Sequence, residues 1–185
     1  MGSIHRRTPD LGPDFMQAGC NRGRKGIKSH ACPWRSRAVT FSGSSEHTID
    51  DKNRLSIASK YRAELPPSVR AWYCVPWPTG ELRLYPEPIF LELSKQWEQS
   101  LAPSEDEAEL VSTLFEFAEK LEMDSGGRIR LPKKHIKLVG IGSAVAVTGA
   151  NNRLVIRDLE SWQAAERARF EKLSQLVTRT TPSSL

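Results

Sequence analysis

An internal repeat constrains the fold of this 185-residue chain more than any other feature of its sequence. Residues 47–57 (HTIDDKNRLSI) align with residues 121–131 (LEMDSGGRIRL) at an offset of 74, and residues 73–85 align with residues 145–157 at an offset of 72. A motif that occurs twice in this way predicts two equivalent modules in one chain.

Each copy of the repeat reads as a β-hairpin. A polar turn, Asp-Lys-Asn in the first copy and Ser-Gly-Gly in the second, precedes strict alternation of polar and apolar residues. Period-2 alternation after such a turn is typical of a strand with one buried face. A short helix (60–65 or 133–139) and a second pair of strands are expected to follow in each copy.

Two long helices and one of intermediate length are predicted around these strands. Apolar residues at spacings of three and four predict helices over residues 105–122 and 159–177, and residues 89–101 predict a shorter one. The apolar stripes of these helices favour core positions, with an oligomer interface as the alternative.

The expected fold class is mostly β with α (α+β). A module of about 45 residues is too small to bury a core alone, so the two modules are expected to pack together about a pseudo-twofold axis. The predicted organisation is a disordered basic arm (1–40), a first module (41–102), a second module with its leading and closing helices (103–178) and a frayed tail (179–185).

Positive charge is concentrated in the predicted arm. Residues 1–40 contain eight Lys and Arg against two Asp, a net charge of +6, whereas the remaining 145 residues carry 19 positive and 20 negative side chains. An arm of this kind attracts polyanions, nucleic acid above all. The alternatives are a solvated tail or a start codon placed too far upstream.

The composition excludes several classes of protein. No stretch approaches the roughly 18 apolar residues that a transmembrane helix requires. Three cysteines (Cys20, Cys32 and Cys74) are too few for a disulfide framework, and the first residues lack the apolar stretch of a signal peptide. These observations predict a cytoplasmic protein without a membrane partner.

The element that carries chemistry is Asp-x-x-x-Arg, which occurs at Asp50/Arg54 and again at Asp124/Arg128. Across a tight turn, a carboxylate can orient a guanidinium while leaving N–H donors free for a phosphate or a guanine edge. The alternative is a surface ion pair that only holds the turn, worth about 0–1 kcal/mol. Two copies in matching contexts favour the functional interpretation.

These motifs resemble those of the MraZ family of bacterial transcriptional regulators, whose modules are AbrB-like swapped-hairpin DNA-binding domains. The resemblance covers about residues 41–165 and is carried by residues 46–57, Leu84-Tyr-Pro86 and residues 124–132. It implies two tandem swapped-hairpin modules, a ring-like homo-oligomer, and a nucleoid-associated protein that binds direct repeats upstream of the division and cell wall genes. Ala58 departs from the usual proline, which Pro132 retains in the second copy.

The expected DNA-binding positions follow from this resemblance and from the local charge. Arg54 and Arg128 are expected to contact DNA, with Asp50 and Asp124 as their supports. Additional contacts are expected from a smaller group of cations: Lys52, Arg130, Lys133 and Lys134. The partner is double-stranded DNA, and no cofactor, metal or small-molecule substrate is expected.

The sequence is compatible with four other interpretations. Glu46, His47, Asp50 and Asp51 suggest a metal-dependent hydrolase, but the second copy has Leu121 in place of His47. Cys20, His30 and Cys32 suggest a zinc site but lack a Cys-x-x-Cys pair. An antitoxin of the same superfamily would bind both its operator and a toxin. A purely structural scaffold, in which the Arg residues only brace turns, would not bind DNA.

Overall fold

The computed structural model describes residues 39–95 and 104–180, which form a mixed α+β fold with two antiparallel sheets. The first repeat contributes four strands: β1 (Ser44–Thr48), β2 (Arg54–Ser56), β3 (Ala71–Trp77) and β4 (Glu81–Pro86). The second repeat contributes their counterparts: β5 (Glu119–Glu122), β6 (Arg128–Arg130), β7 (Ala144–Ala150) and β8 (Arg153–Asp158). Each copy therefore has its four expected strands, but the expected pairing of the first two is wrong, because β1 and β5 lie in one sheet and β2 and β6 in the other.

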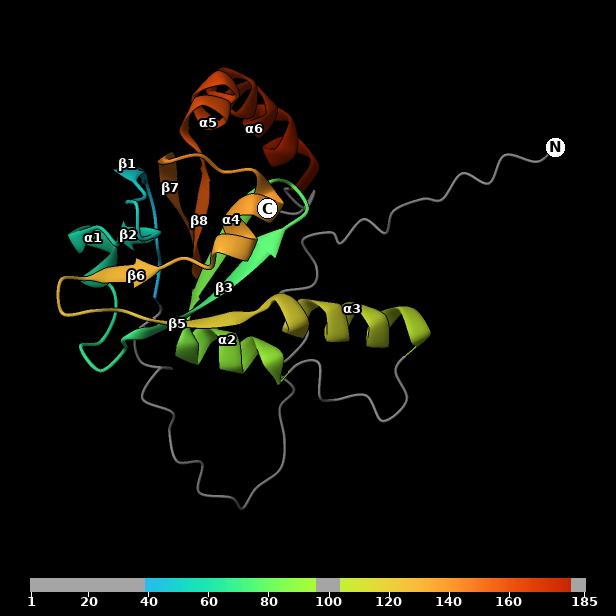
Figure 1. The fold of residues 1–185 in the computed structure, drawn as a ribbon. Coiled ribbons are helices and arrows are strands. Elements are labelled where there is room, and N and C mark those ends of the chain that lie inside the picture. The colour runs from blue at the N-terminus through green and yellow to red at the C-terminus, as the bar shows by residue number, and fades with distance from the viewer. Residues whose placement is uncertain (1–38, 96–103, 181–185) are drawn as a thin grey trace, which may run out of the picture. The chain divides into compact units, whose positions relative to one another are not determined.

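The two repeats exchange strands. In the six-stranded sheet the order is β1-β7-β8-β4-β3-β5, while β2 and β6 form a separate two-stranded sheet (Figure 1). The first strand of each repeat thus pairs with the third strand of the other, β1 with β7 and β5 with β3. The second and fourth strands pair with their own counterparts.

Equivalent residues meet at the middle of both self-pairings. Arg83 lies opposite Val155 in the β4·β8 pair, and Leu55 lies opposite Ile129 in the β2·β6 pair. The differences in number, 155 − 83 = 72 and 129 − 55 = 74, are the two offsets of the sequence repeat. Each of these pairs therefore sits where a twofold operation would exchange the repeats.

One detail of the sequence alignment is wrong. The β3·β4 pair Trp72–Pro86 corresponds to the β7·β8 pair Val145–Asp158, so β7 is offset from β3 by 73 rather than 72. The reason lies in the turns, because residues 78–80 connect β3 to β4 whereas Asn151 and Asn152 alone connect β7 to β8. Trp72, and not Tyr73, is the counterpart of Val145.

The core draws large apolar side chains from both repeats. Trp72, Leu82 and Leu84 of the first repeat and Leu154 and Ile156 of the second are fully buried. Burying side chains of both repeats in one core supplies apolar area that a 45-residue unit could not bury alone. The two repeats therefore depend on each other for stability.

The described helices are α1 (Ser59–Arg62), α2 (Glu87–Ser94), α3 (Glu105–Phe117), α4 (Lys133–Val139), α5 (Leu159–Ala164) and α6 (Glu166–Thr180). Helix α4 has the bounds expected from the sequence. Helix α1 is shorter than expected, and the expected helix over 89–101 begins earlier, at Glu87, and ends at Ser94. Residues 96–103 lie outside the described residues.

Two of the longer helical predictions need correction. The helix expected over 105–122 ends at Phe117, and Leu121 is instead buried in β5, opposite Trp72 of β3. In a strand, the backbone around Leu121 pairs with the edge of β3. A helix would use the same N–H and C=O groups internally and would leave that edge unpaired. The helix expected over 159–177 is divided at Ala165 into α5 and α6.

The apolar stripes of these helices do not form the core that was expected. No residue of α3 or α5 is buried, and Phe170 and Leu173 of α6 are more than half exposed. Phe115 of α3 packs edge-on against Phe90 of α2, with ring centroids 5.7 Å apart, but stays 42% exposed. The apolar side of α6 is thus a surface.

Candidate nucleic-acid interface

Both repeated turns have the same backbone geometry. In the first, the Asp50 N–H donates to the Arg54 carbonyl (3.0 Å) and the Asn53 N–H donates to the Asp50 carbonyl (2.9 Å). Asp124, Gly127 and Arg128 repeat this pattern in the second turn. Asn53 and Gly127 have φ values of 59° and 77°, as required after a type I turn in a three-residue hairpin loop.

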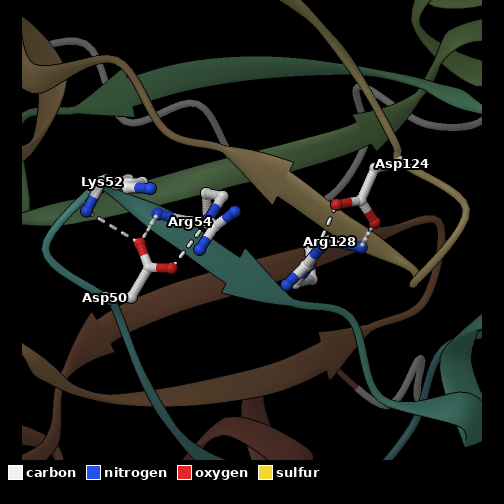
Figure 2. A network of polar contacts seen from close by, with 5 residues as sticks. All are labelled: Asp50, Lys52, Arg54, Asp124 and Arg128. Atoms are coloured by element: carbon white, nitrogen blue, oxygen red, sulfur yellow. Dashed lines mark hydrogen bonds and ion pairs between the residues drawn. The ribbon is translucent and has the colours of Figure 1, made fainter.

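The carboxylate of each turn holds the following arginine. Asp50 Oδ1 accepts hydrogen bonds from the backbone N–H groups of Lys52 (3.0 Å) and Arg54 (2.8 Å), and its Oδ2 accepts from Arg54 Nε at 2.7 Å. Asp124 Oδ1 accepts from the Gly126 and Arg128 N–H groups, and its Oδ2 accepts from Arg128 Nε, all at 2.9 Å. Figure 2 shows how the two carboxylates face Arg54 and Arg128.

These contacts keep both carboxylates ionised. The backbone N–H of Arg54 contributes most to lowering the pKa of Asp50, and the Arg54 guanidinium contributes further. Asp124 has a lowered pKa for the same reasons, with Arg128 as the donor. Each carboxylate accepts a side-chain hydrogen bond from the arginine Nε only. The two Nη nitrogens of each guanidinium have no hydrogen-bond acceptor within residues 39–95 and 104–180. They are available to an external anion or base edge.

The arginines share one face of the β2·β6 ribbon. Leu55 and Ile129 are buried beneath it, so the alternating positions Arg54, Ser56, Arg128 and Arg130 point outward. We refer to these four positions as the outward face of the ribbon. Directly opposite residues share a face, which places Arg130 across from Arg54 and Ser56 across from Arg128. Both Asp-Arg pairs therefore lie on one exposed face of the ribbon.

The hydrogen-bond pattern places these opposite pairs close together. The Ile57 N–H donates to the Gly127 carbonyl (2.9 Å), and the Leu131 N–H donates to the Asn53 carbonyl (2.8 Å). Since hydrogen-bonded and non-bonded pairs alternate along an antiparallel ladder, Arg54–Arg130 is a non-bonded pair, with Cα atoms about 4.5 Å apart. Like charges in such a position destabilise the free protein.

The remaining predicted cations lie at the margins of the ribbon. Lys52 is exposed in the first turn, and Lys133 and Lys134 are exposed at the start of α4, which follows β6 after Pro132. Lys134 Nζ lies 5.0 Å from the ring centroid of Phe117, an interaction that leaves its charge at the surface. The six predicted positions are therefore all exposed or partly exposed.

Sequence reasoning missed one cation. Arg62 of α1 donates from Nε to the Ile57 carbonyl (3.0 Å), and its guanidinium lies against Gly127 in the turn of the other repeat. It therefore lies near Arg128. The sequence feature that could have indicated this contact is Gly127, because any side chain at that position would displace the Arg62 guanidinium.

Three of the four residues of the alternative metal site have other partners. The Glu46 carboxylate accepts a hydrogen bond from Gln163 Nε2 (3.1 Å), His47 Nε2 lies 3.0 Å from Ser45 Oγ, and Asp50 is committed to Arg54. In the described part of the chain, no three His, Cys, Asp or Glu side chains are grouped as metal ligands. Cys20, His30 and Cys32 lie outside the described residues.

None of the described helices is long and apolar enough to cross a membrane.

Comparisons with known proteins agree with this geometry. Residues 114–182 match the family model described as "MraZ protein, putative antitoxin-like". A protein of Herpetosiphon aurantiacus is 32% identical over 126 residues, which cover 66% of this chain and 84% of that protein. A protein of Prosthecochloris aestuarii is 28% identical over 151 residues, covering 74% of this chain and 89% of that protein. Both relatives are named "Transcriptional regulator MraZ". The chain, with its two acid-braced arginine turns, belongs to the MraZ family.

Proposed function

We propose that this protein is a sequence-specific regulator of transcription that binds double-stranded DNA through the outward face of the β2·β6 ribbon. The observation that carries the proposal is the common face of Arg54, Arg128 and Arg130, on which two guanidinium groups are held by Asp50 and Asp124. The names of the relatives, transcriptional regulators, support it. The proposed activity is binding, without catalysis or a cofactor.

The ribbon is suited to the major groove of DNA. That groove is about 12 Å wide and admits a two-stranded β-ribbon. Arg54 and Arg128 read bases or bind phosphates through their Nη nitrogens, because Asp50 and Asp124 fix their Nε positions. The remaining cations contact the phosphate backbone: Lys52, Arg130, Lys133 and Lys134.

The architecture is assigned, within this proposal, to two tandem AbrB-like swapped-hairpin modules about a pseudo-twofold axis, over residues 41–102 and 103–178. The pairing of β1 with β7 and of β5 with β3 supports this assignment. The target is a set of direct repeats upstream of division and cell wall genes, as the family resemblance implies, so the protein acts at the nucleoid in the cytoplasm.

Assembly with further copies of the same chain forms part of the proposal. One ribbon neutralises few phosphates, and non-specific affinity rises with the number neutralised. Several ribbons on repeated sites would raise the overall affinity through effective concentration. The exposed side chains of Phe170 and Leu173 on α6 supply an apolar surface for a second copy.

The description of the matching family model as antitoxin-like favours a second candidate function. In that case the protein would bind its operator and also a toxin. Here the chain continues beyond β8 into α5 and α6, where an antitoxin usually carries an unstructured toxin-binding tail. Regulation of transcription through DNA binding alone is therefore the preferred function.

Footprinting and gel-shift titration with the DNA upstream of the protein's own gene test the proposal, with and without residues 1–40. The wild type is expected to give a salt-dependent shift and a defined footprint. The double variant R54A/R128A should lose the shift while its oligomer size stays unchanged. The matched control K95A/R167A removes two exposed cations, one just after α2 and one in α6, and should bind as the wild type does. Tight binding by R54A/R128A, or no shift by the wild type, would refute the proposal.

A further inference from the structure

The outward face of the ribbon is not symmetric, although its backbone is. Arg54 and Arg128 are exchanged by the repeat, but the residues opposite them differ. Arg130 faces Arg54, and Ser56 faces Arg128. The turns differ in the same sense, because Lys52 of the first turn corresponds to Gly126 of the second.

The charge is therefore concentrated at one end of the ribbon. The Arg54 end gathers Lys52, Arg54 and Arg130, and Lys133 at the start of α4 follows directly after β6. At the Arg128 end the additional cations are Arg62 and, at the start of α1, Lys60, whose Nζ donates to the Ser44 carbonyl (2.6 Å). The Nε of Arg62 is used by the Ile57 carbonyl, and its guanidinium packs on Gly127. The two ends are thus unequal in the cations that they offer to an external anion.

Arg130 is the residue that creates this difference on the ribbon itself. Its counterpart in the repeat is Ser56, since 130 − 56 = 74, and no carboxylate of the described residues pairs with it. An anion that both side chains can bind reduces the electrostatic repulsion between Arg54 and Arg130. A phosphate fits this position because guanidinium groups match its oxygens in geometry and charge.

We propose that Arg130 gives the ribbon a direction on DNA: the Arg54–Arg130 end binds a backbone phosphate that the Arg128–Ser56 end does not, so the duplex is bound in one orientation. The inference rests on the proposed function and deepens it. Because Arg130 has no equivalent at the other end, a ribbon with a symmetric backbone binds a DNA site that lacks twofold symmetry.

Three variants remove, move or duplicate this arginine. R130S removes it, and S56R places a second arginine opposite Arg128. S56R/R130S moves it to the other end while keeping the charge and composition of the chain. Each is compared with the wild type on a single-site duplex taken from the footprinted upstream region. Binding is titrated at several salt concentrations, and hydroxyl-radical footprinting of both strands reports the protected phosphates.

R130S is expected to bind roughly tenfold more weakly and to lower the slope of log K against log salt by about 0.9, the loss of one phosphate contact. The wild type should protect one side of the site more extensively. S56R/R130S should recover the salt slope and reverse that protection. S56R should protect the two sides more evenly than the wild type does, with Lys52 of the first turn as a remaining difference. Thermal unfolding by circular dichroism shows which variants are folded, and the conservative variant R130K, which keeps the charge, should retain the salt slope of the wild type.

A symmetric wild-type footprint, or an R130S variant that matches the wild type in affinity and salt slope, would overturn the inference while leaving the proposed function intact. An unchanged direction of protection by S56R/R130S would overturn it as well. Failure of the wild type to bind DNA would instead refute the proposed function. The two failures are therefore distinguishable.

Discussion

Gly127 and Arg62 come from different repeats and occupy the same small space. A Cβ atom added at Gly127 would lie 2.7 Å from Arg62 Cζ, and Gly127 also has a φ of 77°. The turn that positions Arg128 is therefore open to the Arg62 guanidinium only because residue 127 has no side chain.

Replacing Gly127 with alanine is expected to destabilise the protein by about 1–3 kcal/mol, through the positive φ and displacement of Arg62. Gly80→Ala is the matched control, since Gly80 has a φ of 78° but its added Cβ would meet nothing closer than 3.7 Å. Urea denaturation of both variants checks the prediction. Equal losses of stability would show that the Arg62 contact contributes nothing.

A substitution at position 58 is expected to stabilise the protein. Ala58 precedes α1 with a φ of −53°, and its counterpart Pro132 precedes α4 with a φ of −64°. Ala58→Pro is expected to raise the free energy of unfolding by about 0.4–1 kcal/mol, because proline restricts the unfolded chain without straining this backbone. Pro132→Ala should lower it by a similar amount. A less stable A58P variant would contradict this in the same denaturation experiment.

Asp50 should titrate below its ordinary range, and Arg54 should account for only part of the shift. A carboxylate with a lowered folded pKa stabilises the protein above its unfolded pKa of about 3.9, and this contribution disappears as the pH falls through the lowered folded value. In Arg54→Ala the backbone donors remain, so the pKa of Asp50 should rise only part of the way back. NMR titration of the side-chain carboxyl carbons measures this, with Asp124 as the unaffected internal control.

Mild acid should weaken the fold through His135. This side chain is 3% exposed, its Nδ1 has no partner in the described residues, and burial lowers its pKa. The neutral form is therefore favoured in the folded state. Stability is complete above the unfolded pKa of about 6.5 and declines as the pH falls from there toward the lowered folded value. His135→Leu should reduce the fall of the denaturation midpoint between pH 7.5 and 5.5, with the remainder coming from His47, whose pKa burial also lowers. An unchanged decline would contradict the assignment.

The surface of α6 can be tested independently of DNA. Phe170→Glu places a charge on a side chain that is 76% exposed, so a monomer should fold normally while an assembly that uses this surface dissociates. Leu91→Glu on α2, which is 45% exposed, is the control. Analytical ultracentrifugation should show smaller species for the first variant only. Identical sedimentation of both variants would place the subunit contact elsewhere.

The turns could be predicted from the sequence because their geometry is local. Asp50 and Arg54 are four residues apart around a loop whose polar residues favour a turn, and the same holds for Asp124 and Arg128. The hydrogen bonds confirm that each carboxylate reaches its arginine. Whether the arginines bind DNA stays a prediction.

The errors arose where distant partners decide the outcome. Leu121 continues the helical spacing of residues 105–117, and only the backbone of β3 makes it part of a strand. Arg62 is likewise an ordinary helix residue in sequence, and only the exchange of strands brings it to Gly127. The one-residue shift between β3 and β7 follows from loop lengths that a short alignment does not resolve.

The crossing of β1 to β7 and of β5 to β3 means that neither half of the molecule contains its own complete sheet. A fragment that ended before α3 would leave β3 with an open edge and β1 without a neighbour. Two identical fragments could supply the missing strands to each other. Dividing the chain between its two repeats would therefore replace strand pairing within one molecule by a dimer whose stability depends on protein concentration.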